Sequence, residues 1–379
     1  MMKHYLKRMT ALLLSVLMCM CAFVPALADG ADTIKLAVIA PLTGDFAQYG
    51  EAYRTAVELT VNQVNAAGGI GGRMLAYDIF DDKNDARESA TLAGRIASDD
   101  SYIAVVGPFA STCALACAPI LQNAGIVQMC PTCTHPDLTS TGEYIFRGAI
   151  TSELEAPIFA DVTLNKLGAK KVGIIYTQDD WGITTEQEYA KKLEELGGEI
   201  VIAESYISGS TRDFAPILTK IAGEDIDLLF VAAMYNDSAM ILEQLKQLGY
   251  EGKFKVQGTG SLYTDEFLAL AGDNAEGMYI TASFYAANPE KNVQDFVTAY
   301  KEAFGGEPNL FAASVYDGVG LIVKALESGA TDRASLRDAL AGISDFDGVT
   351  GKASFNENRD VIKGEVVLKI EDGKFVYVD

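Results

Sequence analysis

Apolar runs of strand length alternate along this chain with longer segments in which apolar residues recur at helical spacing. The clearest example is residues 34–40, which are almost wholly apolar and precede a glycine-containing loop and a helix predicted over residues 51–67. Such a strand is typical of a parallel sheet covered on both faces. Gly68 and Gly69 suit the left-handed conformation that ends a helix. The pattern predicts a strand–loop–helix unit whose loop lies where open α/β sheets bind ligands.

This unit recurs in two similar series. In the first series, strands and helices alternate over residues 34–40, 51–67, 75–80, 85–98 and 102–106. In the second series, they alternate over residues 171–176, 183–196, 199–206, 212–222 and 227–231. Strands that alternate with helices of this length form parallel sheets with right-handed crossovers. We therefore predict an α/β fold with two Rossmann-like lobes that face each other across a cleft.

The last third of the chain continues the pattern and then changes. Strands are predicted at residues 254–257 and 278–283, and helices at residues 263–271, 293–304, 312–328 and 334–341. Short antiparallel strands are predicted at residues 351–355, 365–370 and 374–378, with Asp372-Gly373 as a hairpin turn.

Residues 1–28 have the composition of an export signal peptide. Basic residues precede an apolar run at residues 11–24, and a small-residue cleavage site follows at residues 26–28. The apolar run is short for a membrane span. A permanent membrane anchor is one alternative that we favour less. Lipid attachment at Cys19 or Cys21 is another, which we favour less because a lipid-attachment site needs a small residue where Met18 and Met20 stand. We expect an exported protein that is periplasmic, extracellular or on the cell surface.

Length and charge narrow the classes of function. The chain has 379 residues, which is too long for one ordinary core and supports two lobes. Its net charge of −22 argues against binding to nucleic acid or to anionic membranes.

Short motifs in a fixed order carry a resemblance to a known family. They are Ala40-Pro41-Leu42-Thr43-Gly44, Ala47-Gln48-Tyr49-Gly50, Asn65-Ala66-Ala67-Gly68-Gly69-Ile70-Gly71-Gly72, Asp81-Asp82, Val106-Gly107-Pro108-Phe109-Ala110-Ser111, Ala124-Gly125-Ile126, Pro131-Thr132-Cys133-Thr134, Tyr316-Asp317-Gly318 and Gly348-Val349-Thr350-Gly351. The ordered set, which covers nearly all of the chain after residue 28, resembles the branched-chain amino acid (Leu/Ile/Val) substrate-binding proteins of ABC transporters.

The resemblance implies a type I periplasmic-binding fold, with two lobes joined by a three-strand hinge. The N-terminal lobe would comprise residues 32–149 plus 283–349, and the C-terminal lobe residues 150–282 plus 350–379. By analogy, the chain would cross between the lobes near residues 148–152, 281–283 and 349–351. The ligand would lie between the lobes, which close on it by hinge bending.

The function implied by the resemblance is capture rather than catalysis. The protein would bind an amino acid or a similar small polar ligand and deliver it to the membrane permease of an ABC importer. We expect a monomer without a cofactor or bound metal. The alternatives are a sensory ligand-binding module for amides, ureas or carboxylates, and a cysteine-based redox enzyme.

Several residues are candidates for ligand contact. Ser111 and Thr112 open a predicted helix, whose unpaired N–H groups and hydroxyls suit a carboxylate. The alternative is a plain helix N-cap. Thr132 and Thr134 follow the next strand, and the matching family positions present main-chain and hydroxyl groups to the ligand.

Aromatic residues and one acid complete the candidate set. Tyr49 matches an aromatic family position that faces the cleft, and Trp181 stands where relatives often carry tyrosine and could cover the ligand. Tyr235, Asp237 and Tyr263 are further candidates for cleft contacts.

The acid with which relatives bind the ligand's ammonium group is absent here. The matching position falls at about Gly260. Asp237, Asp180 and Glu153 are possible substitutes, although each is an ordinary loop charge in the simplest interpretation. The ligand's identity therefore stays open.

Cysteine and histidine give little support to an enzyme. Cys113, Cys117, Cys130 and Cys133 have a spacing that superficially suggests a metal or redox site, but disulfides or buried free thiols fit an exported protein better. His135 is the only histidine after the signal peptide, which leaves no basis for a Ser/His/Asp arrangement. Residues 68–72 lack the order of glycines that binds dinucleotides.

Overall fold

The computed structural model describes residues 33–378, and the predicted signal peptide at residues 1–28 lies outside them. Two separate sheets organise the described chain. The first sheet is wholly parallel, in the order β2-β1-β3-β4-β5. Its strands are β1 (Ile34–Ala40), β2 (Leu75–Asp81), β3 (Tyr102–Val106), β4 (Val127–Cys130) and β5 (Ile145–Arg147).

The second sheet has the order β15-β14-β10-β9-β8-β6-β7. Neighbours among β7, β6, β8, β9 and β10 pair in parallel, whereas β14 and β15 at one edge pair antiparallel. The strands are β6 (Lys171–Thr177), β7 (Glu199–Tyr206), β8 (Leu228–Ala232), β9 (Lys255–Gly258), β10 (Tyr279–Ala282), β14 (Val366–Glu371) and β15 (Lys374–Val378).

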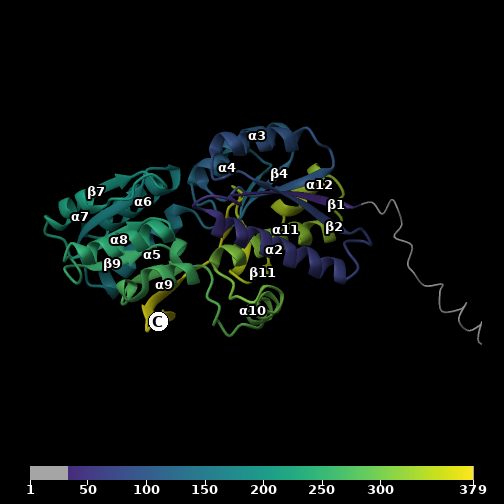
Figure 1. The fold of residues 1–379 in the computed structure, drawn as a ribbon. Coiled ribbons are helices and arrows are strands. Elements are labelled where there is room, and N and C mark those ends of the chain that lie inside the picture. The colour runs from purple at the N-terminus through teal and green to yellow at the C-terminus, as the bar shows by residue number, and fades with distance from the viewer. Residues whose placement is uncertain (1–32, 379) are drawn as a thin grey trace, which may run out of the picture. The chain divides into compact units, whose positions relative to one another are not determined.

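Helices accompany each sheet, as Figure 1 shows. With the first sheet lie α2 (Ala47–Ala66), α3 (Ala86–Ala97), α4 (Ser111–Asn123), α10 (Lys291–Phe304), α11 (Leu310–Glu327) and α12 (Arg333–Ala341). With the second sheet lie α5 (Ser152–Asp161), α6 (Asp180–Glu195), α7 (Ala215–Ala222), α8 (Tyr235–Gln247) and α9 (Asp265–Ala271). We call the first sheet with its helices the first lobe, and the second sheet with its helices the second lobe.

Burial explains the strand pattern. In β1 every residue except Lys35 is buried, because helices pack on both faces of the sheet. Helix α11 is buried along most of its length, and the side chain of Asn309 caps its start. The predicted α/β fold with two lobes of parallel sheet is confirmed, although β5, α5 and α8 were not predicted from the sequence.

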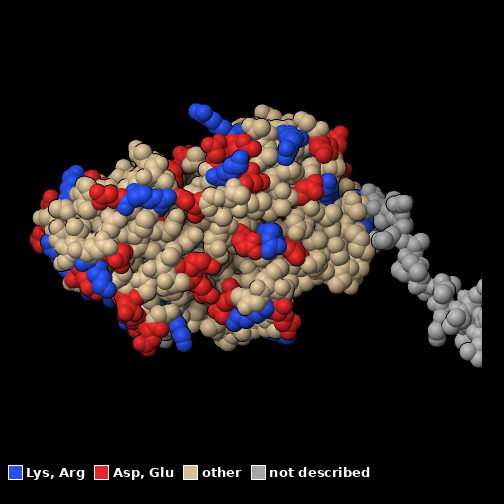
Figure 2. All heavy atoms as spheres, viewed as in Figure 1, with Lys and Arg blue, Asp and Glu red and all other residues tan. Residues whose placement is uncertain are grey.

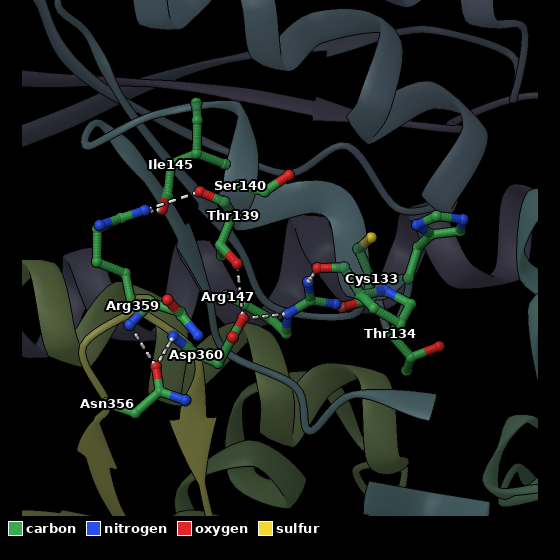
Figure 3. A network of polar contacts seen from close by, with 12 residues as sticks. Cys133, Thr134, Thr139, Ser140, Ile145, Arg147, Asn356, Arg359 and Asp360 are labelled. Carbon is green, nitrogen blue, oxygen red and sulfur yellow. Dashed lines mark hydrogen bonds and ion pairs between the residues drawn. The ribbon is translucent and has the colours of Figure 1, made fainter. Parts of the chain in front are cut away.

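A small third sheet joins β11 (Phe346–Gly348), β12 (Gly351–Phe355) and β13 (Val361–Ile362). It packs beside the first lobe through a buried ion pair, in which the Arg147 Nε lies 2.7 Å from the Asp360 Oδ1 (Figure 3). A bridge between Arg147 and Asp360 continues this contact in the backbone. The chain then returns to the second lobe at β14. These contacts favour a third crossing at residues 363–365, rather than near residues 349–351 as the sequence predicts. Residues 350–362, which the sequence assigns to the C-terminal lobe, therefore lie with the first lobe.

Charged side chains of both signs lie on the surface of the described chain. On the face shown in Figure 2, acidic and basic side chains alternate in small groups rather than forming one broad basic area. Within residues 33–378, no helix has the length and apolar character needed to cross a membrane.

Candidate functional site

One cavity is lined by both lobes and contains most of the candidate residues. Its empty space amounts to about 870 Å³, a volume that includes space open to solvent. Its first-lobe wall includes Ser111, Thr112, Thr132 and Thr134, and Trp181 faces them from the second lobe. The structure therefore brings together five of the nine residues that the sequence predicts.

The start of α4 forms the centre of the first-lobe wall. The N-cap residue is Ala110, which has no side chain that can cap the helix, so Ser111 and Thr112 occupy the first helical turn. The simple N-cap interpretation of these two hydroxyls is therefore wrong. Because no side chain caps the helix, its first N–H groups remain suited to an anionic ligand group. The Thr112 Oγ1 also accepts a hydrogen bond from the Asp180 backbone N–H, at 3.3 Å, which joins the two lobes.

The loop between β3 and α4, which positions the start of α4 at the cavity, requires a glycine. Gly107 has a φ of +101°, and a Cβ atom there would lie 2.3 Å from the Ile39 carbonyl oxygen. No other residue type fits this position without moving the backbone of the neighbouring strand.

Thr132 and Thr134 line the cavity but use their hydroxyls within the protein. The Thr132 Oγ1 donates to the Phe109 carbonyl oxygen at 2.8 Å and lies 2.7 Å from the Tyr53 Oη. The Thr134 Oγ1 lies 3.0 Å from the Ser152 Oγ, at the start of α5. These bonds hold the two residues in place, so we expect them to shape the pocket as much as to contact a ligand.

Trp181 lies in the first turn of α6, on the second-lobe wall. Asp179 caps this helix by accepting a hydrogen bond from the Gly182 N–H at 2.8 Å. Burial is the main cause that raises the pKa of Asp179 above its ordinary value. The sequence did not single out Asp179, which also lines the cavity.

Tyr49 lies behind the cavity wall rather than in it. It is fully buried, and its ring contacts those of Phe109 and Phe311, both of which line the cavity. The Tyr49 Oη accepts a hydrogen bond from the Tyr235 N–H at 3.1 Å. Tyr49 therefore supports an aromatic wall and connects the first lobe to α8.

The other three candidates also lie outside the cavity lining. Tyr235 starts α8 and packs edge-on against Tyr49, with centroids 5.4 Å apart. The buried Asp237 carboxylate accepts hydrogen bonds from Tyr206 and Ser208. The Tyr263 Oη accepts from the Ala286 N–H at 3.0 Å. In this arrangement they fix loops around the cleft.

Besides Asp179, two further carboxylates that the sequence analysis missed line the cavity. Glu155 lies on α5, and Glu365 lies between β13 and β14, where the Thr281 Oγ1 donates to its Oε2 at 2.7 Å. Burial, and then the nearby Glu365 carboxylate, raise the pKa of Glu155 well above its ordinary value. Burial raises the pKa of Glu365 to about 7. Both acids adjoin segments that cross between the lobes. Correct positions of these crossings would therefore have identified them as candidates from the sequence.

Gly260 lines the cavity, as expected for the position of the missing acid, and its neighbours there are Thr259 and Ser261. Neither Asp180 nor Glu153 is part of the lining, and Glu153 is exposed to solvent. The carboxylates of this cavity therefore come from other segments of the chain than the loop after β9.

The four cysteines of the described chain are free and buried, so the disulfides that we considered do not form in this structure. Within residues 33–378, no group of three or more histidine, cysteine, aspartate or glutamate side chains is arranged to hold a metal ion.

Two α/β lobes that share a cavity define a two-lobed binding protein. The chain belongs to the periplasmic binding protein family, whose model matches residues 33–374. The predicted family and type I fold are confirmed. The relatives are binding proteins, and the family is named for a location outside the cytoplasm.

Individual relatives cover nearly the whole chain. The leucine-, isoleucine-, valine-, threonine- and alanine-binding protein of Pseudomonas aeruginosa is 27% identical over 333 residues, which are 87% of this chain and 88% of that protein. The branched-chain amino acid transporter substrate binding protein LivJ of Streptococcus pneumoniae, solved with isoleucine, is 29% identical with a TM-score of 0.84, over 91% of this chain and 100% of that one. A solute binding protein of an ABC transporter from Rhodopseudomonas palustris, solved with 3,4-dihydroxybenzoic acid, is 27% identical with a TM-score of 0.83, over 91% of this chain and 95% of that one.

Proposed function

We propose that this protein is the extracytoplasmic solute-binding component of an ABC importer. It captures an amino acid or a similar small polar ligand between its two lobes, which close on the ligand, and it delivers the ligand to a membrane permease. It acts as an exported monomer, without a cofactor and without chemistry on the ligand. Ser111, Thr112, Thr132, Thr134 and Trp181 contact the ligand in this proposal, whereas Tyr49, Tyr235, Asp237 and Tyr263 support the site.

The observation that carries the proposal is the uncapped start of α4 in a cavity shared by the two lobes. Helix N–H groups and hydroxyls at one wall suit a carboxylate, and the half-buried acids elsewhere in the cavity suit a positive group. An amino acid presents both. The amino acid relatives support this ligand class.

Aromatic carboxylates are a second candidate class of ligand. Phe46, Phe109, Phe311 and Trp181 line the cavity, so a flat ring could pack among them. The relative solved with 3,4-dihydroxybenzoic acid supports this candidate.

A thermal-shift screen tests the function. The panel holds the common amino acids, amides, ureas, and aliphatic and aromatic carboxylates, with the protein lacking residues 1–28. A ligand that binds only the folded state adds about 2.7 kcal/mol at a hundred times its dissociation constant, so a true ligand should raise the melting temperature by several degrees. A panel that leaves the melting temperature unchanged throughout contradicts the proposal for these classes.

A further inference from the structure

Glu155 and Glu365 are half-buried acids that line the cavity beside segments where the chain crosses between the lobes. Glu155 follows the first crossing, Ser283 follows the second, and Glu365 lies within the third. All three line the same cavity. We call this part of the cavity the crossing end, in contrast to the start of α4.

Neither carboxylate at the crossing end has a basic partner. Among the described residues, no hydrogen bond or ion pair engages the Glu155 carboxylate, and Glu365 accepts only from Thr281. Arg147 favours the charged form of Glu155, but its guanidinium is bound by Asp360 and by the Cys133 and Pro136 carbonyl oxygens.

Lys363 is the cation that acts on Glu365, and it is also engaged elsewhere. Its Nζ donates to the Thr350 Oγ1 at 2.7 Å, and Thr350 in turn donates to the buried Asp317 carboxylate. No lysine or arginine lines the cavity among residues 33–378. The crossing end therefore holds two acids whose compensation by protein cations is incomplete.

An independent observation shows that the cavity has unmet polar groups. The Thr185 side chain lines the cavity, the residue is only 2% exposed, and its Oγ1 has no hydrogen-bond partner. The Asn84 Oδ1 in the same lining is likewise buried without a partner. Because buried polar groups are normally hydrogen-bonded, these atoms point to a polar ligand that bonds with them.

We propose that Glu155 and Glu365 together bind a protonated amino group of the ligand, which therefore carries an amine as well as a carboxylate. This inference rests on the proposed function and narrows its ligand class to amines that bear a carboxylate. The carboxylate lies at the start of α4, and the amine lies at the crossing end.

The arrangement also determines how protons behave on binding. Two nearby half-buried carboxylates do not both ionise easily, and the pKa of each is raised, so the pair retains a proton near neutral pH in the empty cavity. A bound ammonium group stabilises both charges, and the retained proton leaves for solvent. The amine of the ligand keeps its own proton throughout.

Calorimetric titration of three variants tests the proposal. The amino acid that binds best in the screen is titrated together with its two analogues, one lacking the amine and one lacking the carboxylate. The variants are Glu155→Gln, Glu365→Gln and the control Glu153→Gln, which makes the same change on an exposed residue of the same helix. Each of the first two should weaken binding of the amino acid by about tenfold or more, and the control should stay within about twofold. The analogue without the amine should bind the wild-type protein more weakly than the amino acid does, and the difference should shrink in Glu155→Gln and Glu365→Gln.

The possible failures are distinguishable. If nothing in the full panel binds, the proposed function fails. If a ligand binds but both glutamine variants bind it as tightly as wild type, or if the analogue without the amine binds best, the amine assignment fails and the proposed function stands. Should a variant not fold, titrations of the wild-type protein in buffers of different ionisation enthalpy decide instead: release of protons near pH 7 supports the proposal, and no exchange of protons contradicts it.

Discussion

The ring of Tyr49 stacks on the ring of Phe109, with centroids 4.5 Å apart and planes inclined by 13°. Phe109 faces the cavity, and Tyr49 lies behind it. The hydroxyl of the same tyrosine accepts a hydrogen bond from the backbone of Tyr235 in the second lobe. One side chain thus packs the cavity wall with its ring and joins the two lobes with its hydroxyl.

These two roles predict different effects for two substitutions. Tyr49→Phe keeps the ring and removes the contact between the lobes, so the free energy of unfolding should fall by about 1 kcal/mol at most, while ligand affinity falls several-fold. Tyr49→Ala leaves a cavity behind Phe109 and should lower the free energy of unfolding by about 3–5 kcal/mol. Urea unfolding and calorimetric titration measure the two quantities. Equal stability of the two variants would show that the ring does not support the wall.

Ser111 and Thr112 should affect binding and leave the fold intact. Because Ala110 is the N-cap, removing either hydroxyl does not remove a helix cap. Ser111→Ala and Thr112→Val should each weaken ligand binding by about tenfold, through the loss of hydrogen bonds worth about 1.5 kcal/mol when they meet a charged group. The melting temperature of the empty protein should change little.

The matched control for these two variants is Thr91→Ala, which removes an exposed hydroxyl from α3, away from the cavity. It should leave the affinity as in wild type. Unchanged affinity in both Ser111→Ala and Thr112→Val would place the carboxylate elsewhere.

The raised pKa values at the crossing end predict an effect of pH on stability. The pKa of Glu365 is about 7 in the folded protein, against an ordinary value of 4.5. Its contribution to stability is therefore fully present below the ordinary value and is lost as pH rises from about 4.5 through 7. Glu155 acts in the same direction because its pKa is also raised.

Other buried acids also have raised pKa values and lower the stability as pH rises. The test is therefore the difference between wild type and the Glu365→Gln variant. From pH 5 to 8, wild type should lose about 1–3 kcal/mol more of its unfolding free energy than Glu365→Gln does, because the glutamine cannot ionise. Parallel curves for the two proteins in urea unfolding would contradict the assignment.

Burial of the thiols predicts their reactivity. Burial raises the pKa of the Cys113 thiol to about 12. At Cys133 burial is outweighed by a hydrogen bond with Cys130 and by the charge of Arg147, which lower the pKa to about 6. All four cysteines of the described chain are buried and free, so access limits their reaction. In the protein without residues 1–28, a thiol reagent such as Ellman's should react slowly with the native state and label four thiols after unfolding. Fewer than four thiols in the unfolded, unreduced protein would show that a disulfide forms.

The sequence predicted the repeated α/β units well, because strands such as residues 34–40 are apolar throughout and glycine pairs mark the helix ends. Helix α8 escaped prediction because its start, Tyr235 to Asp237, resembles a polar loop, and only packing against Tyr49 and Tyr206 shows otherwise. For the same reason Asp237 looked available to a ligand, although neighbouring hydroxyls already bind it.

The acids of the cavity illustrate what sequence spacing leaves out. Glu155 and Glu365 are 210 residues apart, and only the path of the chain through two crossings brings them to one cavity. Ser111 and Thr112 were recognisable because a local feature, the start of a helix after a strand, places them. Residues that meet through a hinge lack such a local signal.

The buried ion pair between Arg147 and Asp360 predicts a strong coupling. Arg147 is fully buried, its Nε lies 2.7 Å from the Asp360 Oδ1, and Thr139 donates to the same oxygen (Figure 3). Asp360→Asn leaves the guanidinium without a counter-charge and should lower the free energy of unfolding by about 3–5 kcal/mol. The double variant Arg147→Met with Asp360→Asn should cost less than the sum of the two single variants, because it leaves no buried charge unpaired.

The matched control is Asp225→Asn, which breaks the exposed pair of Lys171 and Asp225 and should cost less than about 1 kcal/mol. Because the Arg147 guanidinium also donates to the Cys133 and Pro136 carbonyl oxygens, on either side of Thr134, its loss should loosen this part of the cavity wall and weaken ligand binding as well. Urea unfolding of all four variants, with titration of those that fold, measures both effects. If Asp360→Asn were as stable as Asp225→Asn, the ion pair would not hold the small sheet to the first lobe.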